Sequence, residues 1–98
     1  MNVQFIREAM ANVVKSGTGT AAQVPGIRVA GKTGSGQFSV RDASGELVPD
    51  TRTWMVSFAP FDAPRYVVAV IVEGGDSGGH TAAPIVGAIY RKLFQKSN

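Results

Sequence analysis

Residues Gly26 to Gln37 read GIRVAGKTGSGQ, and their types and spacing suggest chemistry at Lys32. The first eight residues satisfy G-x-x-x-x-G-K-[ST], the pattern of loops that hold nucleotide phosphates. The same letters contain the triplet Lys32-Thr33-Gly34, which belongs to a different class of site. A phosphate-binding loop requires a helix that begins near Lys32. The secondary structure around this lysine therefore decides between the two interpretations.

The composition limits what the chain can be. Its 98 residues, 44% hydrophobic and 17% charged, suffice for one small domain or a part of one. The net charge is +3, and the ten lysines and arginines are scattered along the chain rather than clustered, which argues against a nucleic-acid partner. Cysteine is absent, so disulfides and thiolate metal sites are excluded, and we expect neither a metal nor a cofactor. No apolar run reaches membrane-spanning length, and the first residues are typical of an amphipathic helix rather than a signal peptide.

Hydrophobic spacing predicts a helix near each end of the chain. Residues 2–16 place apolar side chains three to five positions apart, with Asn2 as N-cap and Gly17 as a left-handed residue after the last turn. Residues 81–95 carry a second apolar stripe, with Thr81 as the expected N-cap.

Three strands are predicted between the helices. Residues 27–38 and 52–59 alternate in the manner of strands, whereas 65–73 is apolar at almost every position and is interpreted as a central strand. A loop from Phe38 to Thr51, with turn chemistry in its middle, joins the first two. The order predicts an α+β fold, a three-stranded antiparallel sheet with both helices packed on one face. The other face of the apolar strand then lacks cover, which indicates that part of the core is missing.

The residues around the triplet disfavour a phosphate-binding loop. The segment before Lys32 alternates like a strand, and Gly34, Ser35 and Gly36 after it are poor helix formers. An apolar run that ends in Glu73 resembles a strand with a magnesium-binding acid, but the chain is too short for a nucleotide-binding sheet with its crossover helices. We therefore expect Lys32 to Gly34 to lie within an antiparallel strand.

Four further segments accompany the triplet. They are Gly17-Thr-Gly-Thr-Ala21 before it, and Trp54-Met-Val-Ser-Phe-Ala-Pro60, Pro64-Arg-Tyr-Val-Val-Ala-Val-Ile-Val72 and Ala82-Ala-Pro-Ile85 after it. In this order and spacing they resemble the C-terminal end of the transpeptidase domain of penicillin-binding proteins. The resemblance covers essentially the whole chain. It implies a single segment over residues 1–98 with a partial transpeptidase or β-lactamase-like fold, taken from a serine D,D-transpeptidase that cross-links peptidoglycan stem peptides and binds β-lactams.

The resemblance implies roles for the residues of the triplet strand. The backbone N–H of Ser35 is the expected oxyanion-hole donor, together with the N–H of a serine that this sequence lacks. Thr33, aided by the Ser35 hydroxyl, is expected to hydrogen-bond the terminal carboxylate of the substrate. Lys32 is expected to supply positive potential for that carboxylate and to assist proton transfer. Gly34 and Gly36 are expected to keep the strand edge clear for the peptide backbone.

Two elements of the family do not occur in these 98 residues, the nucleophilic Ser-x-x-Lys and the Ser-x-Asn sequence. We therefore expect the isolated chain to be unable to form an acyl-enzyme. Its expected partners are stem peptides ending in D-Ala-D-Ala, β-lactams and the rest of the transpeptidase domain. The resemblance also implies that strand 66–72 is flanked by a strand from the beginning of that domain, which is not present here, so self-association is expected through its exposed outer edge. The parent enzyme is expected at the extracytoplasmic face of the bacterial inner membrane.

Other interpretations of these residues stay open on the sequence alone. The chain also fits a stand-alone module that holds a peptide or β-lactam without chemistry, and the triplet also fits a carboxypeptidase or β-lactamase of the same fold. Lys32 by itself fits an exposed edge-strand charge that deters aggregation. His80, with no second histidine or any cysteine, fits a helix-start residue after the turn from Gly74 to Gly79. Trp54 and Phe58 fit core positions.

Overall fold

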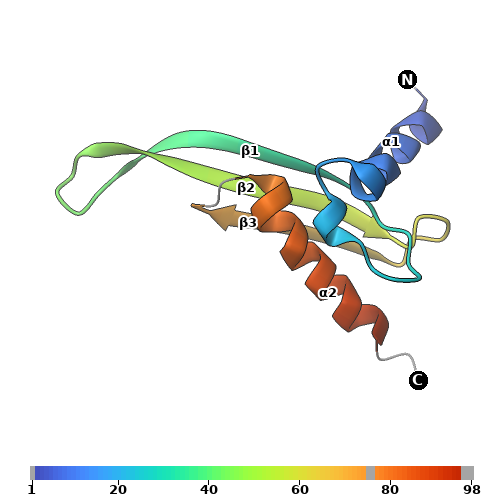
Figure 1. Cartoon of the computed structure of the whole chain (residues 1–98). Helices are drawn as coiled ribbons and strands as arrows, with labels where there is room; N and C mark the ends of the chain where they lie inside the picture. The colour runs from blue at the N-terminus through green and yellow to red at the C-terminus, as the bar shows by residue number, and fades with distance from the viewer. Residues whose placement is uncertain (1, 75–76, 96–98) are drawn as a thin grey trace.

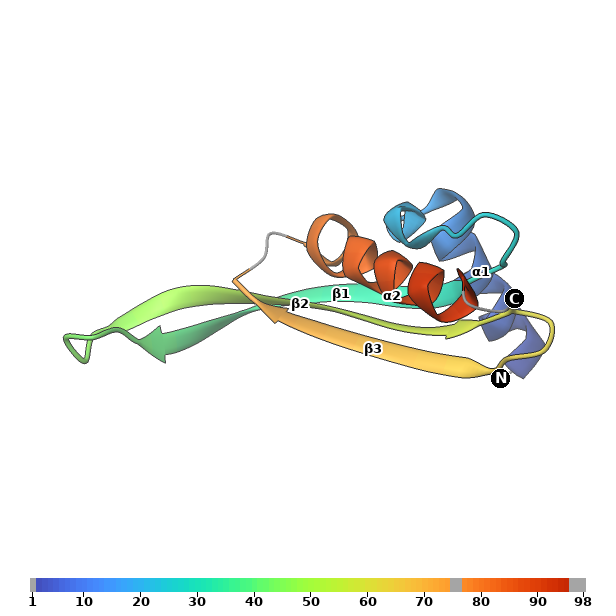
Figure 2. The ribbon, with the colours of Figure 1, turned by 90° about the horizontal axis from the view of Figure 1, so that it is seen from below.

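The chain forms the predicted three-stranded antiparallel sheet, with the C-terminal helix over one face and the N-terminal helix crossing the end of the sheet (Figures 1 and 2). The computed structural model describes residues 2–74 and 77–95. The strand order is β1-β2-β3. The elements are α1 (Val3–Ser16), η1 (Thr20–Ala22), β1 (Ala30–Arg41), β2 (Leu47–Ala59), β3 (Tyr66–Glu73), η2 (Gly78–Ala82) and α2 (Ala83–Gln95).

Helix α1 begins as the sequence predicts and ends differently. The side chain of Asn2 caps it by accepting hydrogen bonds from two N–H groups of the first turn. Gly17 follows the last turn with φ −104°, so the predicted left-handed conformation is wrong. Its N–H instead bonds to the carbonyls of Asn12 and Val13, and a Cβ at this position would lie 3.1 Å from the backbone of Val13. Close approach of the chain to its own helix therefore explains the glycine.

Strand β1 starts three residues later than predicted, because the chain turns just before it. Gly26 has φ +80°, a conformation open to glycine, and the N–H of Ile27 bonds to the carbonyl of Val24 at 3.1 Å. This turn delays the regular ladder to Ala30, which pairs with Phe58.

The predicted loop from Phe38 to Thr51 is wrong except at its centre. The ladder of β1 and β2 continues through it as far as the pair Arg41 and Leu47, and only the turn between them is irregular. The resulting hairpin extends well beyond the rest of the sheet (Figure 2). Pro49 is tolerated in β2 because β3 ends opposite Arg52, so the place of its missing N–H faces no strand among the described residues.

Strand β3 lies at an edge of the sheet, and its outer edge has no neighbouring strand among the described residues. Its side chains alternate, with Val68 and Val70 packed towards α2. Val67 and Ile71 point to the opposite, open face and are 73% and 74% exposed. The strand is thus apolar on both faces, but the described chain covers only the face towards α2.

The start of the C-terminal helix also differs from the prediction. Thr81 is not its N-cap, because a π-helical turn, η2, precedes α2 and begins at Gly78. Ser77 caps this turn by accepting the N–H of His80 at 3.0 Å. The predicted turn from Gly74 to Gly79 contains residues 75 and 76, which lie outside the described residues.

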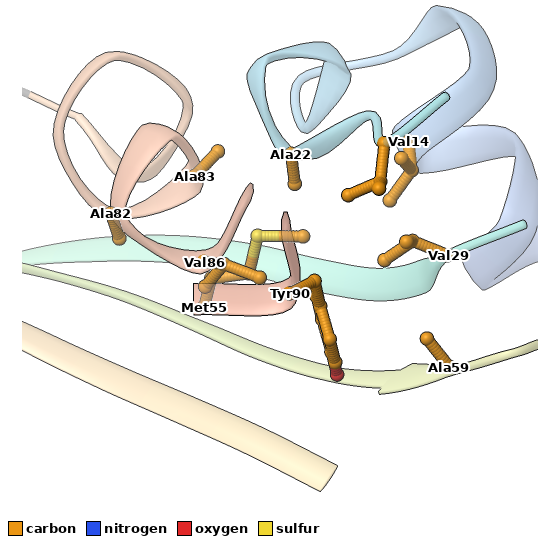
Figure 3. Close-up of a cluster of buried hydrophobic side chains, with 10 residues drawn as sticks. Val14, Ala22, Val29, Met55, Ala59, Ala82, Ala83, Val86 and Tyr90 are labelled. Carbon is orange, nitrogen blue, oxygen red and sulfur yellow. The ribbon is translucent and has the colours of Figure 1, made fainter. Parts of the chain in front are cut away.

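The core lies between the sheet and the helices (Figure 3). Tyr90 and Met55 are completely buried there, and the Tyr90 hydroxyl lies 2.9 Å from that of Ser57, which donates to the Val68 carbonyl. Trp54 is only half-buried on the open face, so its predicted core position is wrong. Ten buried residues form the cluster, namely Val14, Ala22, Val24, Val29, Met55, Ala59, Ala82, Ala83, Val86 and Tyr90.

A second, smaller cluster closes the end of the sheet near α1. It consists of Ala11, Ala30 and Phe61, with Phe58 packed against it, so the core prediction for Phe58 holds only in part. Within the described ranges, no helix is both long enough and apolar enough to cross a bilayer.

Candidate functional site

The outer edge of β1 carries the predicted site residues. Within residues 2–74 and 77–95, no strand pairs with this edge. The N–H of Asp42 bonds to the carbonyl of Glu46, which fixes the phase of the ladder: even-numbered residues of β1 direct their N–H and C=O groups to β2. Thr33 and Ser35 therefore direct theirs to the free edge. An extended peptide can hydrogen-bond to such an edge.

The triplet side chains lie on two faces, because successive residues of a strand alternate. Lys32 is exposed on the open face, and its Nζ donates to the backbone carbonyl of Thr33 at 2.7 Å. That carbonyl belongs to the free edge, so the ammonium group sits beside it. Thr33 and Ser35 place their side chains on the helix face, where Thr33 is 7% exposed and Ser35 is open to solvent.

Thr18 contacts Thr33, an interaction that no pattern in the sequence predicts. Their Oγ1 atoms lie 2.6 Å apart, a short distance for two neutral hydroxyls. Thr18 belongs to the segment Gly17 to Ala21, which the sequence places near the triplet only by the family resemblance. The only feature of the sequence that points to this contact is that Thr18 carries a hydroxyl group able to form a hydrogen bond.

Two glycines of η2 bring a third segment against the triplet. A Cβ on Gly78 would lie 2.8 Å from Cβ of Thr33 and 2.9 Å from backbone atoms of Gly34. A Cβ on Gly79 would overlap the carbonyl oxygen of Thr18. The paired glycines, interpreted from sequence as a flexible turn, therefore allow close packing at the site.

The segment from Gly17 to Ala21, strand β1 and the turn η2 line an open pocket of about 440 Å³. Residues 17–21, 33–35 and 77–80 contribute to its lining, so His80 lines the same pocket as Thr33 and Gly34. Lys32 of the triplet is not among the lining residues. Among the described residues, no group of three or more histidines and carboxylates is placed to hold a metal ion. The pocket wall offers hydroxyls and backbone groups, which suits hydrogen bonding to a polar ligand.

Trp54 gives Gly34 a role that differs from the predicted one. A Cβ on Gly34 would overlap the indole of Trp54, on the open face. A Cβ on Gly36 would meet the ring of Phe38 at 3.4 Å, an ordinary contact. The missing side chain of Gly34 thus makes room for the indole.

The phosphate-loop interpretation of residues 26–33 is wrong. Lys32 and Thr33 lie within β1 and pair with Val56 and Met55 of β2. A helix N-terminus, which such a loop needs for its free N–H groups, is not found at Lys32.

Comparison with known proteins identifies relatives of this chain. Residues 2–91 match the family described as the penicillin binding protein transpeptidase domain. The stage V sporulation protein D of Bacillus subtilis is 44% identical over 90 residues, covering 88% of this chain and 14% of that protein. The peptidoglycan D,D-transpeptidase MrdA of Acinetobacter baumannii is 38% identical over 85 residues, covering 79% of this chain and 12% of that protein.

Solved structures of penicillin-binding proteins also resemble this chain. The apo transpeptidase domain of penicillin-binding protein 3 from Burkholderia pseudomallei superposes with a TM-score of 0.74 at 32% identity, over 95% of this chain and 29% of that chain. Penicillin-binding protein A of Mycobacterium tuberculosis, in a ceftriaxone acyl-enzyme complex, superposes with a TM-score of 0.73 at 31% identity, over 92% of this chain and 20% of that chain. The chain thus spans only a small part of these relatives.

Proposed function

Because the chain belongs to the penicillin-binding protein transpeptidase family, we propose that it supplies the substrate-binding strand of a peptidoglycan D,D-transpeptidase. In this proposal residues 1–98 form the C-terminal part of the transpeptidase domain, and the intact enzyme cross-links stem peptides and binds β-lactams. The observation that carries the proposal is the free edge of β1, to which Thr33 and Ser35 direct their backbone groups.

The proposed substrate lies along this edge as an additional strand. Its scissile carbonyl then points at the N–H of Ser35, which acts as an oxyanion-hole donor with a second N–H from the nucleophilic serine of the remaining domain. The donor is a backbone group of a regular strand, so little reorganisation accompanies the reaction. The terminal carboxylate of the peptide, or the carboxylate of a β-lactam, accepts a hydrogen bond from Thr33.

Lys32 contributes charge to this site. Its Nζ lies 2.7 Å from the Thr33 carbonyl, so a full positive charge stands at the edge where the carboxylate is proposed to bind. An ammonium group and a carboxylate that approach within a few ångströms attract each other even in partly solvated surroundings. With a Ser-x-Asn element beside it in the remaining domain, the same ammonium group assists proton transfer.

The isolated chain is proposed to lack the activity of the intact enzyme. Neither Ser-x-x-Lys nor Ser-x-Asn occurs in its sequence, so the chain by itself is proposed to be unable to form an acyl-enzyme. The rest of the domain is its proposed partner, and without it the outer edge of β3 is proposed to pair with a second copy. The intact enzyme is proposed to act at the extracytoplasmic face of the inner membrane, where its substrate is assembled.

A chimera tests the proposed function. In penicillin-binding protein A of M. tuberculosis, which forms a ceftriaxone acyl-enzyme, the matching segment is replaced by this chain. We expect the chimera to be acylated by ceftriaxone, with the rate measured by mass spectrometry. Lys32→Ala and Thr33→Val should each lower the second-order rate constant by about tenfold or more.

The matched control is Lys15→Ala, which removes an exposed charge at the end of α1 and should leave the rate within about twofold. A folded chimera that ceftriaxone does not acylate contradicts the proposal. Equal rates in the chimera and in its Lys32→Ala variant remove Lys32 from the proposed site.

A further inference from the structure

Thr33 has one hydroxyl proton to donate, and the hydroxyl of Thr18 lies 2.6 Å from it. Each threonine hydroxyl donates once and accepts through two lone pairs, so one of the two is the donor of this hydrogen bond. A carboxylate accepts hydrogen bonds and donates none. Thr33 can therefore serve a carboxylate only while Thr18 is the donor of the pair.

We propose that Thr18 is a positioning residue of the substrate site: it donates to Oγ1 of Thr33 and thereby directs the Thr33 proton to the free edge of β1. The inference rests on the proposed function, because it takes the carboxylate of a peptide or β-lactam as the acceptor at that edge. The two bonds form a chain from Thr18 through Thr33 to the ligand. Each donation polarises the next hydroxyl, so the terminal bond to an anion is strengthened.

The backbone holds Thr18 in position for this contact. The N–H of Gly19 bonds to the carbonyl of Val13 at 2.9 Å, which ties the segment to the end of α1. Gly79 packs against the carbonyl of Thr18 so closely that a side chain on it would overlap. Three segments thus meet at the threonine pair, so the backbone on both sides of it is held in place although the Thr18 side chain is itself exposed.

Thr33 is packed in place, whereas Ser35, two residues further along the same face of β1, is not. Thr33 is 7% exposed, and Gly78 covers its Cβ. Ser35 is exposed, and within the described residues no hydrogen bond fixes its hydroxyl. Thr33 is therefore the donor that is ordered before a ligand arrives, and Thr18 is the group that orders its proton.

The test compares a carboxylate with its ester in the same chimera. The probes are ceftriaxone and the methyl ester of its ring carboxylate, and the readout is the ratio of their acylation rate constants. Thr18→Val keeps the shape of the side chain and removes the donor. We expect it to lower the rate with the acid about five- to tenfold and the rate with the ester by less than about twofold. Thr18→Ser, which restores a donor, should keep the ratio of the unmodified chimera.

The controls separate the possible failures. Thr51→Val, the same replacement at a position of β2 that pairs with Gln37 and does not line the pocket, should not change the ratio. A chimera that reacts equally with acid and ester overturns the role of Thr33 in the proposed function, and this inference with it. A clear preference for the acid that survives in Thr18→Val overturns the inference alone. If Thr18→Val reacts with neither probe, the smaller Thr18→Ala variant is measured, and an equal loss with both probes there shows a purely structural role and overturns the inference.

Discussion

The indole of Trp54 occupies the space that a side chain on Gly34 would need, across the hydrogen-bonded pair that joins β1 to β2. The two residues belong to segments that the sequence connects only by their order along the chain. Their contact ties the packing of the open face to the backbone of the triplet.

We predict that Gly34→Ala destabilises the chain by about 1–3 kcal/mol, because the new methyl group displaces the Trp54 ring. The free energy of unfolding in urea measures the effect. In a Trp54→Leu background the same change should cost at least about 1 kcal/mol less, since the pair is coupled.

Gly36→Ala is the matched control for this prediction. A Cβ there would meet its nearest atom at 3.4 Å, an ordinary contact, so the change should cost little. Similar costs for the two alanine variants would show that backbone conformation, and not the indole, requires glycine at position 34.

The sequence predicted the sheet because its local signals agree with the final packing. Alternation predicts the three strands without fixing which face of β2 is buried, and Asn2 caps α1 as its residue type suggests. It failed where contacts between distant segments decide. The length of the hairpin depends on pairing across the turn, and the start of the C-terminal helix depends on Gly78 packing against Thr33.

The sequence predicted the strand residues of the candidate site but not the contacts that other segments make with them. The triplet and the period of two indicate which residues line the edge of β1. The Thr18 contact joins residues fifteen positions apart in irregular structure, and no periodic pattern marks it. Trp54 was assigned to the core because large aromatic side chains usually are buried, whereas here the open face lacks cover within the described chain.

Tyr90→Phe tests the buried hydrogen bond between α2 and β2. The Tyr90 hydroxyl lies 2.9 Å from that of Ser57, which still donates to the Val68 carbonyl when Tyr90 is replaced. We therefore expect a loss of about 1 kcal/mol in the free energy of unfolding at pH 7. A loss above about 3 kcal/mol would contradict this account, because it would mean that Ser57 depends on Tyr90 for its position.

The same residue predicts a dependence on pH. Burial raises the pKa of Tyr90 above its usual value near 10, although its bond to Ser57 lowers it somewhat. The folded protein then holds the Tyr90 proton at pH values where the unfolded chain has lost it. The contribution of this proton to the free energy of unfolding is complete below the pKa of Tyr90 in the unfolded chain, and it is lost as the pH rises through the higher pKa of the folded protein. Stability should therefore fall above about pH 10, and this part of the fall should be absent in Tyr90→Phe.

The isolated chain should not react with penicillin. It lacks the Ser-x-x-Lys nucleophile, and its own serines have no lysine three residues later to activate them. Mass spectrometry after incubation with benzylpenicillin measures the outcome, with the acylated chimera as positive control. A stable adduct on any serine of the 98-residue chain would refute the expectation.

The isolated chain should associate with further copies of itself through β3. Val67, Ile71 and Val56 are 73%, 74% and 47% exposed on the open face, and the outer edge of β3 has no neighbouring strand among the described residues. Unpaired backbone groups beside exposed apolar side chains favour pairing with another chain. The hairpin of β1 and β2 continues along the strands beyond the end of β3 and does not fold over this face (Figure 2).

Sedimentation over a wide concentration range should therefore show dimers or larger species. Ile71→Lys should shift the equilibrium to monomer, because a charge in the contact must be desolvated. Leu47→Lys is the matched control: it places the same charge on a side chain that is 59% exposed at the far end of the hairpin, and it should leave the association unchanged. A chain that stays monomeric and unfolds cooperatively at every concentration would show that the residues present already complete a stable core, and that β3 needs no partner.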